Sequence, residues 1–160
     1  MYIGFEPAGK LIIQLAPTGM VPKKTETPYV PITPEEIAED TYKAYKLGAS
    51  VVHIHARDDE GRPTYKKEKY REIFSAVKRK CPDIVICAST SSRNDRSVEH
   101  RAEVLELYPD MASLMLGTAN FAETPSINPQ ADIISLAGLM KKHGVKPELE
   151  VLETGVRERG

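Results

Sequence analysis

The chain of 160 residues has the length of one ordinary globular domain, and we expect residues 1–160 to form a single domain. Its composition, 41% hydrophobic and 28% charged, is typical of folded proteins and excludes intrinsic disorder, collagen and coiled coils. The 22 basic and 23 acidic residues nearly balance, which argues against nucleic acid as a partner. No apolar run has the length of a membrane span, so we expect no membrane association, and residues 1–10 lack the pattern of a signal peptide.

The two cysteines, Cys81 and Cys87, flank one predicted strand and lack a C-x-x-C spacing. Few cysteines without a metal or disulfide pattern are typical of a reduced compartment. We therefore expect a cytoplasmic protein in which neither cysteine has a functional role.

Short apolar runs alternate with helical patterns along the chain. The runs predict buried strands at residues 11–16, 51–55, 84–88, 111–116 and 149–152. The helical patterns cover a segment that begins with the capping box at Thr33 and ends at Gly48, then residues 67–80, 97–107, and a segment from Pro129 to Gly144. This alternation predicts a parallel sheet with right-handed crossovers, either an open doubly wound sheet or five strands of a barrel. The sequence after the first strand, Ala16–Gly19, is not a Gly-rich phosphate-binding fingerprint.

A His-x-His sequence, His53 and His55, ends the second predicted strand. Side chains two residues apart share one face of a strand, so both imidazoles project from the same face. They lie near the carboxyl end of the strand, where parallel α/β folds place their active sites. Neutral imidazole is a ligand that Zn²⁺ prefers, so the pair predicts a zinc site that needs a third ligand from elsewhere. The alternative is a pair of core histidines that bind no metal.

Other polar residues follow the predicted strands at the same rim. Arg57 either belongs to a polar loop that turns at Gly61 or orients an anion or a metal ligand. The serines of 89–92 either cap the next helix or bind a substrate oxygen, and Ser113 is either such a group or a buried hydroxyl bonded to backbone. Glu150 either faces a barrel interior, where a histidine or a metal compensates its charge, or faces water at a sheet edge.

Several segments, in order along nearly the whole chain, resemble the β-keto acid cleavage enzyme family. They are Ala16–Gly19, Pro31–Ala38, Val52–Asp58 with Gly61–Pro63, Pro109–Leu114 with Asn120–Phe121, and Pro147–Val151 with Thr154–Gly155. The resemblance implies an α/β fold of the TIM (β/α)₈ barrel type, of which this chain forms an incomplete, N-terminal part with about five parallel strands and four helices.

The resemblance also implies a zinc-dependent transferase of amino acid degradation. A β-keto acid and acetyl-CoA would give acetoacetate and a new acyl-CoA, while Zn²⁺ bound to His53 and His55 polarises the oxygens of the keto acid. Positions that hold the substrate in the family are occupied here by Ser89, Ser92 and Ser113. We expect Glu150 to act as the catalytic carboxylate from within the barrel.

Three residues depart from the family pattern. Ser91 replaces a glycine, and Met115 replaces a frequent asparagine and so removes an expected polar contact. Val21 stands where family members that act on an amino-substituted keto acid have a glutamate that pairs with the amine. We therefore expect a substrate with an apolar or other tail, not an amino group.

The family's barrels are about twice as long as this chain. The third zinc ligand of the family, a glutamate on the last strand, would lie beyond residue 160, together with an arginine and an aspartate thought to drive proton transfer. Five strands alone leave an exposed edge. A separately encoded second half, pairing of two half-barrels, or truncation of a longer product would each explain this. The expected partners are therefore the β-keto acid, acetyl-CoA, and either a second copy or a complementary half-barrel chain.

Three hypotheses of function follow. The leading one is the N-terminal portion of a zinc-dependent β-keto acid cleavage enzyme. The second is a catalytically silent half-barrel that assembles with a partner chain. The third is an unrelated metal-dependent hydrolase with a His-x-His strand.

Overall fold

The computed structural model describes residues 11–121 and 124–152, so residues 1–10 and the Thr154–Gly155 motif lie outside the described residues. Within this part, strands and helices alternate. In chain order they are β1 (Gln14–Leu15), α1 (Pro34–Lys46), β2 (Val51–Ile54), α2 (Lys67–Lys80), β3 (Val85–Ala88), α3 (Val98–Ala102), the 3₁₀ helix η1 (Glu103–Leu107), β4 (Met111–Met115), α4 (Gln130–His143) and β5 (Lys146–Glu150). No helix of this part is both long and apolar enough to cross a bilayer.

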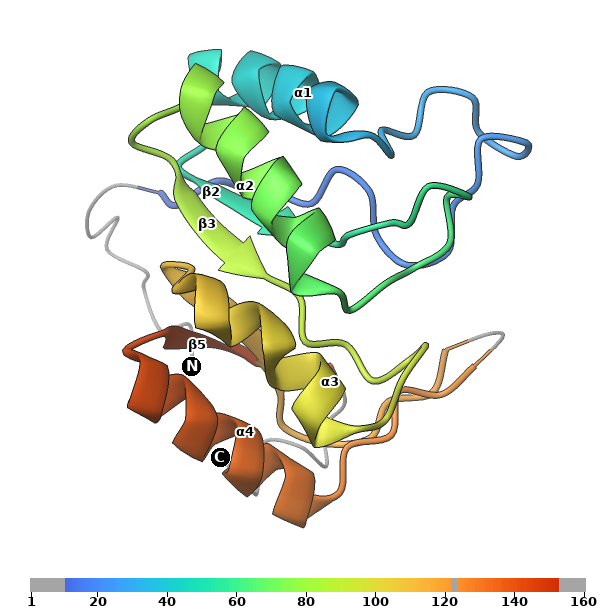
Figure 1. Ribbon diagram of the computed structural model, residues 1–160, viewed down its shortest axis with the longest axis vertical. Coiled ribbons are helices and arrows are strands. Elements are labelled where there is room, and N and C mark those ends of the chain that lie inside the picture. Colours follow the sequence, from blue (N-terminus) through green and yellow to red (C-terminus); the bar gives the residue numbers. More distant parts are fainter. Residues whose placement is uncertain (1–10, 122–123, 153–160) are drawn as a thin grey trace, which may run out of the picture.

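The five described strands form one parallel sheet in the order β1-β2-β3-β4-β5. Each new strand is added on the same side of the sheet, as in a (β/α)₈ barrel, whereas a doubly wound sheet reverses its direction. Right-handed crossovers then place every helix on the same face, and Figure 1 shows α1 to α4 together in front of the strands. The prediction of an incomplete (β/α)₈-type fold is confirmed, and the doubly wound alternative is wrong.

The hydrophobic core fills the space between the sheet and this layer of helices. Val52 and Ile54 of β2 point into it and pack with Ile73 and Val77 of α2 and with Leu136 of α4. Because successive strand residues alternate between faces, His53 lies on the opposite face, away from the helices. The sheet therefore has an apolar outer face and a polar inner face.

The helix boundaries follow local sequence signals. The capping box at α1 is present as predicted: Thr33 Oγ1 accepts from the Glu36 amide at 3.2 Å, and the Thr33 amide donates to the Glu36 carboxylate at 3.1 Å. Gly48 follows α1 with a φ of +103°, and Gly144 ends α4 with a φ of +70°, conformations that favour glycine. Helix α2 has the predicted bounds.

The two edge strands differ from the predictions. Strand β1 is only two residues long, and Leu11, which was predicted to belong to it, is 84% exposed. Among the described strands β1 has one neighbour, β2, so its other edge is unpaired. Strand β5 begins at Lys146, whereas the prediction began at Leu149. The prediction missed the first half of the strand because that half contains no apolar run. Pro147 is tolerated there because β5 lies at the edge of the described sheet. The third predicted helix is divided into α3 and η1, and its cap is Ser97, whose hydroxyl accepts from the His100 amide, not a serine of 89–92.

Replacing Leu136 by alanine should show how much the core between α4 and the sheet contributes to stability. Leu136 is fully buried, so we expect Leu136→Ala to lower the free energy of unfolding by about 2–5 kcal/mol in urea denaturation. Ile134 lies on the same helix but is 64% exposed, so Ile134→Ala serves as the matched control with a change below about 1 kcal/mol. Equal effects of the two variants would contradict this packing.

Candidate active site

His53 and His55 lie on the inner face of the sheet, as the His-x-His spacing predicts. His53 belongs to β2 and is buried, and His55 follows directly after that strand. Their ring centroids are 4.9 Å apart with an angle of 33° between the planes. The prediction that both rings share one face is confirmed, and their separation is short enough for two ring nitrogens to approach a single cation.

Glu148 of β5 holds His53 in place. Its Oε2 lies 2.8 Å from Nδ1 of His53 and accepts the Cys87 thiol at 3.1 Å, while Oε1 accepts from Nε2 of Gln14. A carboxylate that accepts from Nδ1 fixes the tautomer in which Nε2 carries the free lone pair. Side chains of β1, β2 and β3 therefore converge on Glu148 of β5, and Nε2 is the nitrogen of His53 that remains available to a ligand.

His53, Cys87 and Glu148 also form a group whose ligand atoms lie within 4.8 Å of one another, close enough to hold a metal ion. Burial and the adjacent Glu148 carboxylate, however, raise the pKa of the Cys87 thiol, so the thiol is protonated and acts as a donor. A protonated thiol is a poor metal ligand. When no metal is bound, Cys87 and Glu148 therefore form a hydrogen-bonded support for His53.

The protonation states of the neighbouring groups suit metal binding and proton transfer. Burial chiefly, together with the neighbouring His53 ring and the cations Arg57 and Arg93, lowers the pKa of His55 to about 3, so its imidazole is neutral. Nδ1 of His55 is buried and has no hydrogen-bond partner among the described residues. Burial raises the pKa of Glu150, and the Glu148 carboxylate adds to this effect, although His53 opposes it.

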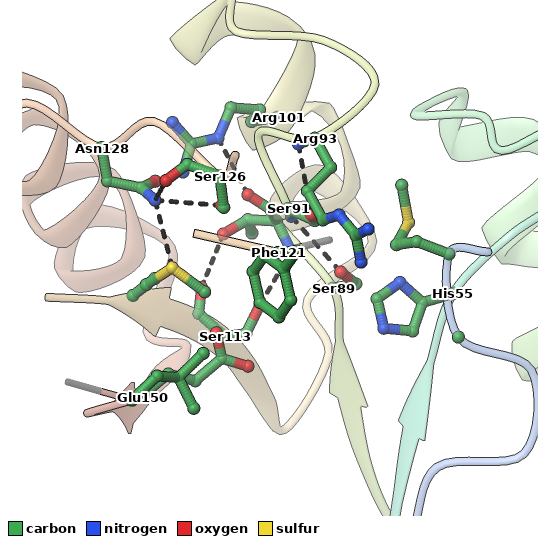
Figure 2. A pocket seen from close by; sticks show the side chains of 15 residues that line it. His55, Ser89, Ser91, Arg93, Arg101, Ser113, Phe121, Ser126, Asn128 and Glu150 are labelled. Atoms are coloured by element: carbon green, nitrogen blue, oxygen red, sulfur yellow. Dashed lines mark hydrogen bonds between the residues drawn. The ribbon is translucent and has the colours of Figure 1, made fainter. Parts of the chain in front are cut away.

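A cavity of about 320 Å³ opens where the strands end (Figure 2). His55, Ser89, Ser113 and Glu150 line it from four different strands or strand ends. The structure therefore brings together four of the six residues that the sequence predicts for the site. The other two, His53 and Ser92, do not line this cavity, although the His53 ring lies next to the His55 ring.

The serines are held in a network of local hydrogen bonds. Ser113 Oγ accepts from the Thr90 amide at 3.0 Å, while Thr90 Oγ1 donates to the Ser113 carbonyl at 2.6 Å. Ser89 Oγ accepts from the Ser91 amide at 3.3 Å and faces the cavity. Ser92 Oγ pairs with Ser126 Oγ at 2.9 Å, so Ser92 contacts the cavity wall only through Ser126.

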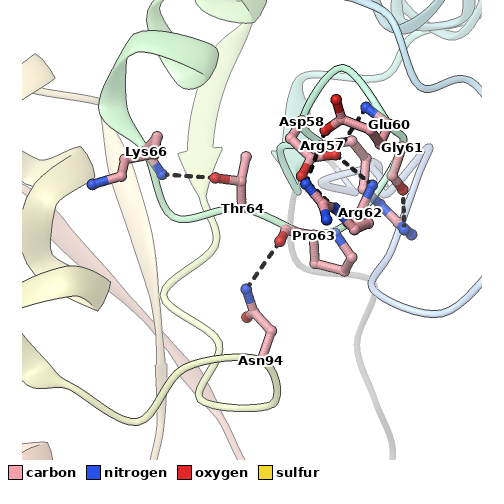
Figure 3. Close-up of polar contacts among 9 residues, drawn as sticks. All are labelled: Arg57, Asp58, Glu60, Gly61, Arg62, Pro63, Thr64, Lys66 and Asn94. Atoms are coloured by element: carbon pink, nitrogen blue, oxygen red, sulfur yellow. Dashed lines mark hydrogen bonds and ion pairs between the residues drawn. The ribbon is translucent and has the colours of Figure 1, made fainter.

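Arg57 links two loops at the rim of the cavity through hydrogen bonds. Its guanidinium donates to the carbonyls of Gly61, Gly19 and Pro22 at 2.9–3.2 Å and does not line the cavity. Figure 3 shows the contact with Gly61, in the loop that makes the predicted turn, where Gly61 has a φ of +77°. Arg57 thereby anchors the β1–α1 loop, which contributes Gly19 to the cavity.

Sequence reasoning missed four residues at the site: Glu148, Arg93, Arg101 and Asn128. Arg101 is buried and donates to the Thr90 carbonyl and to Asn128 Oδ1 at 2.8 and 2.7 Å, and Asn128 Nδ2 contacts the Met115 sulfur. Met115 stands where the family often has an asparagine, and Asn128, from another segment, thus supplies an amide group beside it. The Glu148-x-Glu150 spacing was a usable signal, since residues i and i+2 of a strand share a face; no local pattern marks the other three.

The fold and the site are those of a (β/α)₈-type protein with a candidate metal centre at the carboxyl ends of its strands. The sequence matches the β-keto acid cleavage enzyme family over residues 10–159. The chain therefore belongs to this family, and the resemblance seen in its segments is confirmed.

Individual relatives agree with this assignment. The 3-keto-5-aminohexanoate cleavage enzyme of Fusobacterium nucleatum is 40% identical over 148 residues, which are 92% of this chain and 54% of the relative. The 3-oxoadipate:acetyl-CoA acetyltransferase of Cupriavidus necator is 37% identical over 142 residues, 89% of this chain and 50% of the relative. The chain thus spans about half the length of these curated relatives.

A solved structure supports the same fold. The ternary complex of ObcA with C4-CoA adduct and oxalate aligns with a TM-score of 0.75 and 28% identity, covering 84% of this chain and 34% of that chain. The apo structure of ObcA aligns equally well, with a TM-score of 0.75.

The contact between Glu148 and His53 should make stability depend on acid. Chiefly because His53 donates to it, the pKa of Glu148 is lowered from 4.5 to about 2 in the folded chain. A lowered folded pKa stabilises the fold above the unfolded pKa, and this contribution disappears as the pH falls from about 4.5 toward 2. The wild type should therefore lose about 1–3 kcal/mol more unfolding free energy than Glu148→Gln across that range, less than the full shift because the side chain keeps some solvent contact.

Urea denaturation at a series of pH values, with a chelator present, measures this difference. Glu35→Gln is the matched control because Glu35 is exposed on α1, and it should follow the wild type. If Glu148→Gln shows the same pH dependence as the wild type, the ion pair does not form in solution.

Proposed function

We propose that this chain carries half of the active site of a zinc-dependent enzyme that cleaves a β-keto acid with acetyl-CoA. The products would be acetoacetate and an acyl-CoA. The observation that carries the proposal is a pair of neighbouring imidazoles, one of them neutral with a buried unpartnered nitrogen, beside a cavity lined by Ser89, Ser113 and Glu150. The names of the relatives and the CoA adduct in the ObcA complex support this reaction class.

The donor set fits zinc. Both His53 and His55 offer imidazole nitrogen, and the carboxylate of Glu148 orients His53 from behind, as is usual for metal-bound histidine. Two protein ligands leave positions for a third ligand, for water and for a substrate oxygen. When bound, zinc would act as a Lewis acid on the oxygens of the keto acid.

The residues of the chain would divide the remaining tasks. The hydroxyls of Ser89 and Ser113, which line the cavity, would hold the carboxylate or keto oxygen of the substrate, and Ser92 would position this wall through Ser126. Glu150 would exchange a proton with the carbon next to the keto group, because its raised pKa brings it closer to neutral pH than an ordinary carboxylate. Closure of the cavity against water would come from the rim loops that Arg57 ties together.

The tail of the keto acid is proposed from Val21. The aminohexanoate enzymes at 40–42% identity and the oxoadipate enzyme at 37% identity show that the family accepts different tails. Val21 offers no carboxylate to an amine, so we propose that this chain does not prefer an amino-substituted keto acid. A coupled assay that showed preference for the aminated substrate would contradict this.

A second candidate function is assembly with further strands, and the exposed edges of the sheet favour it. Leu11 and Ile12 beside β1, and Leu149 and Leu152 at β5, are exposed large apolar side chains at the two edges of the described sheet. Such edges pair readily with other strands. A second copy or a complementary half-barrel chain would be detected by light scattering, and a monomer with no zinc and no partner would contradict both candidates.

Zinc binding should depend on the two histidines and not on the cysteine. We expect His53→Ala and His55→Ala each to weaken zinc binding by about 100-fold or more, and Cys87→Ser to change it by less than about threefold. Competition with a chromophoric chelator measures these affinities. His100→Ala is the matched control, since His100 stacks on Tyr65 outside the cavity. Loss of zinc in Cys87→Ser but not in His55→Ala would instead place the metal in the His53, Cys87 and Glu148 group.

Turnover provides the direct test of the function. When the chain is assembled with the half-barrel that supplies the third ligand, we expect zinc, acetyl-CoA and a β-keto acid to give acetoacetate and a new acyl-CoA, with a loss of about 100- to 10,000-fold in Glu150→Gln. Zinc content should remain unchanged in this variant, which separates proton transfer from metal binding. Hydrolysis of an ester or amide without acetyl-CoA would contradict the proposed reaction and favour a metal-dependent hydrolase.

A further inference from the structure

One arginine that lines the cavity, Arg93, forms no ion pair with any described residue. Arg93 lies in the loop after β3, and Figure 2 shows its guanidinium pointing toward Ser89 and His55. Among the described residues no carboxylate forms an ion pair with it, and its guanidinium lies over the ring of Phe121, 4.4 Å from the centroid. An arginine packed on an aromatic ring is held in position while its N–H groups stay free for a ligand.

The loop that carries Arg93 is fixed on both sides. The Arg93 amide donates to Ser91 Oγ at 3.3 Å, and the next residue, Asn94, donates from Nδ2 to the Pro63 carbonyl at 3.3 Å (Figure 3). Pro63 belongs to the β2–α2 loop, which Arg57 ties to the β1–α1 loop. The loop that carries Arg93 is therefore held against the β2–α2 loop, while the Arg93 guanidinium packs on the Phe121 ring.

The charges around the cavity leave an excess that an anion would neutralise. Two guanidinium groups, those of Arg93 and Arg101, line the cavity against a single described carboxylate, Glu150. Arg101 is only 4% exposed, and its Nη1 is buried without a partner among the described residues. An unpaired buried donor of this kind is costly unless a ligand or water accepts from it.

Arg93 lies where the inner cavity meets a second one. It also lines a second cavity of about 190 Å³, whose walls include Val21, Lys23 and Glu26. Of these two cavities, Ser89, Ser113 and Glu150 line the inner one, next to His55, and not the second. A keto acid whose reacting end lay among those groups would extend its tail past Arg93, and a tail that ended in a carboxylate would meet the guanidinium.

We propose that Arg93 forms a carboxylate-binding subsite, so that the β-keto acid recognised by this chain is a dicarboxylate whose distal carboxylate pairs with Arg93. This inference rests on the proposed function and specifies its substrate class. Arg93 would be a specificity-determining residue, because an arginine can bind a carboxylate through two parallel N–H···O bonds.

The test uses two ligands that differ only at the tail. 3-Oxoadipate and 3-oxohexanoate share a six-carbon chain and end in a carboxylate or a methyl group. In calorimetric titrations of the zinc-loaded chain, we expect 3-oxoadipate to bind about 10- to 100-fold more tightly than 3-oxohexanoate. Arg93→Gln should reduce this preference to within about threefold by weakening only 3-oxoadipate, while Arg93→Lys should retain part of it. Arg96→Gln, an exposed arginine three residues away that does not line either cavity, is the matched control.

Each other outcome overturns the subsite in a distinguishable way. If Arg93→Gln weakens both keto acids equally, Arg93 binds their shared carboxylate, and the proposed cleavage reaction stands without a dicarboxylate substrate. If it weakens CoA but neither keto acid, the anion is a phosphate of the cofactor. Equal binding of both keto acids by the wild type also refutes the subsite. If neither keto acid binds to zinc-loaded chain, the proposed function fails together with the subsite.

Discussion

The alternation of side chains along parallel strands is the constraint on which this structure depends. Each strand sends one set of residues toward the helices and the other toward the inner face. Val52 and Ile54 thereby enter a closed apolar core, while His53 and the following His55 are presented on the other side. A shift of one residue in register would exchange these sets, burying imidazoles among aliphatic groups, so packing of the core fixes the geometry of the site.

Two glutamates of one strand illustrate how position on the inner face determines chemistry. Glu148 and Glu150 share a face, but donors from His53, Cys87 and Gln14 surround the first. These contacts lower the pKa of Glu148 to about 2, whereas burial raises that of Glu150. A pair of carboxylates whose environments drive their pKa values apart is typical of sites that separate a permanent charge from a proton-transferring group. Glu148 is thus suited to orient a ligand, and Glu150 to exchange a proton.

Most of the scaffold could be predicted from sequence because its signals are local. The capping box at Thr33, the glycines that end α1 and α4, and the i, i+2 spacing of His53 and His55 each act within a few residues. Strand β5 could not be bounded correctly, since Lys146 and Pro147 carry no apolar signal at a sheet edge. The contact of His53 with Glu148 spans 95 residues, and only the folded sheet brings the two together.

The same distinction explains why the cavity's charge escaped sequence reasoning while its two histidines did not. Arg93 lies in the loop after β3 and Arg101 in the short helix α3, and their role depends on which of their N–H groups the fold leaves unpaired. Four buried side-chain atoms of the described residues lack a partner, and two of them, His55 Nδ1 and Arg101 Nη1, belong to residues that line this cavity. Each such atom costs about 1–3 kcal/mol when nothing bonds to it. A fold tolerates that cost where a ligand offsets it, so these two unpaired nitrogens support the proposal of a binding site at the inner face of the rim.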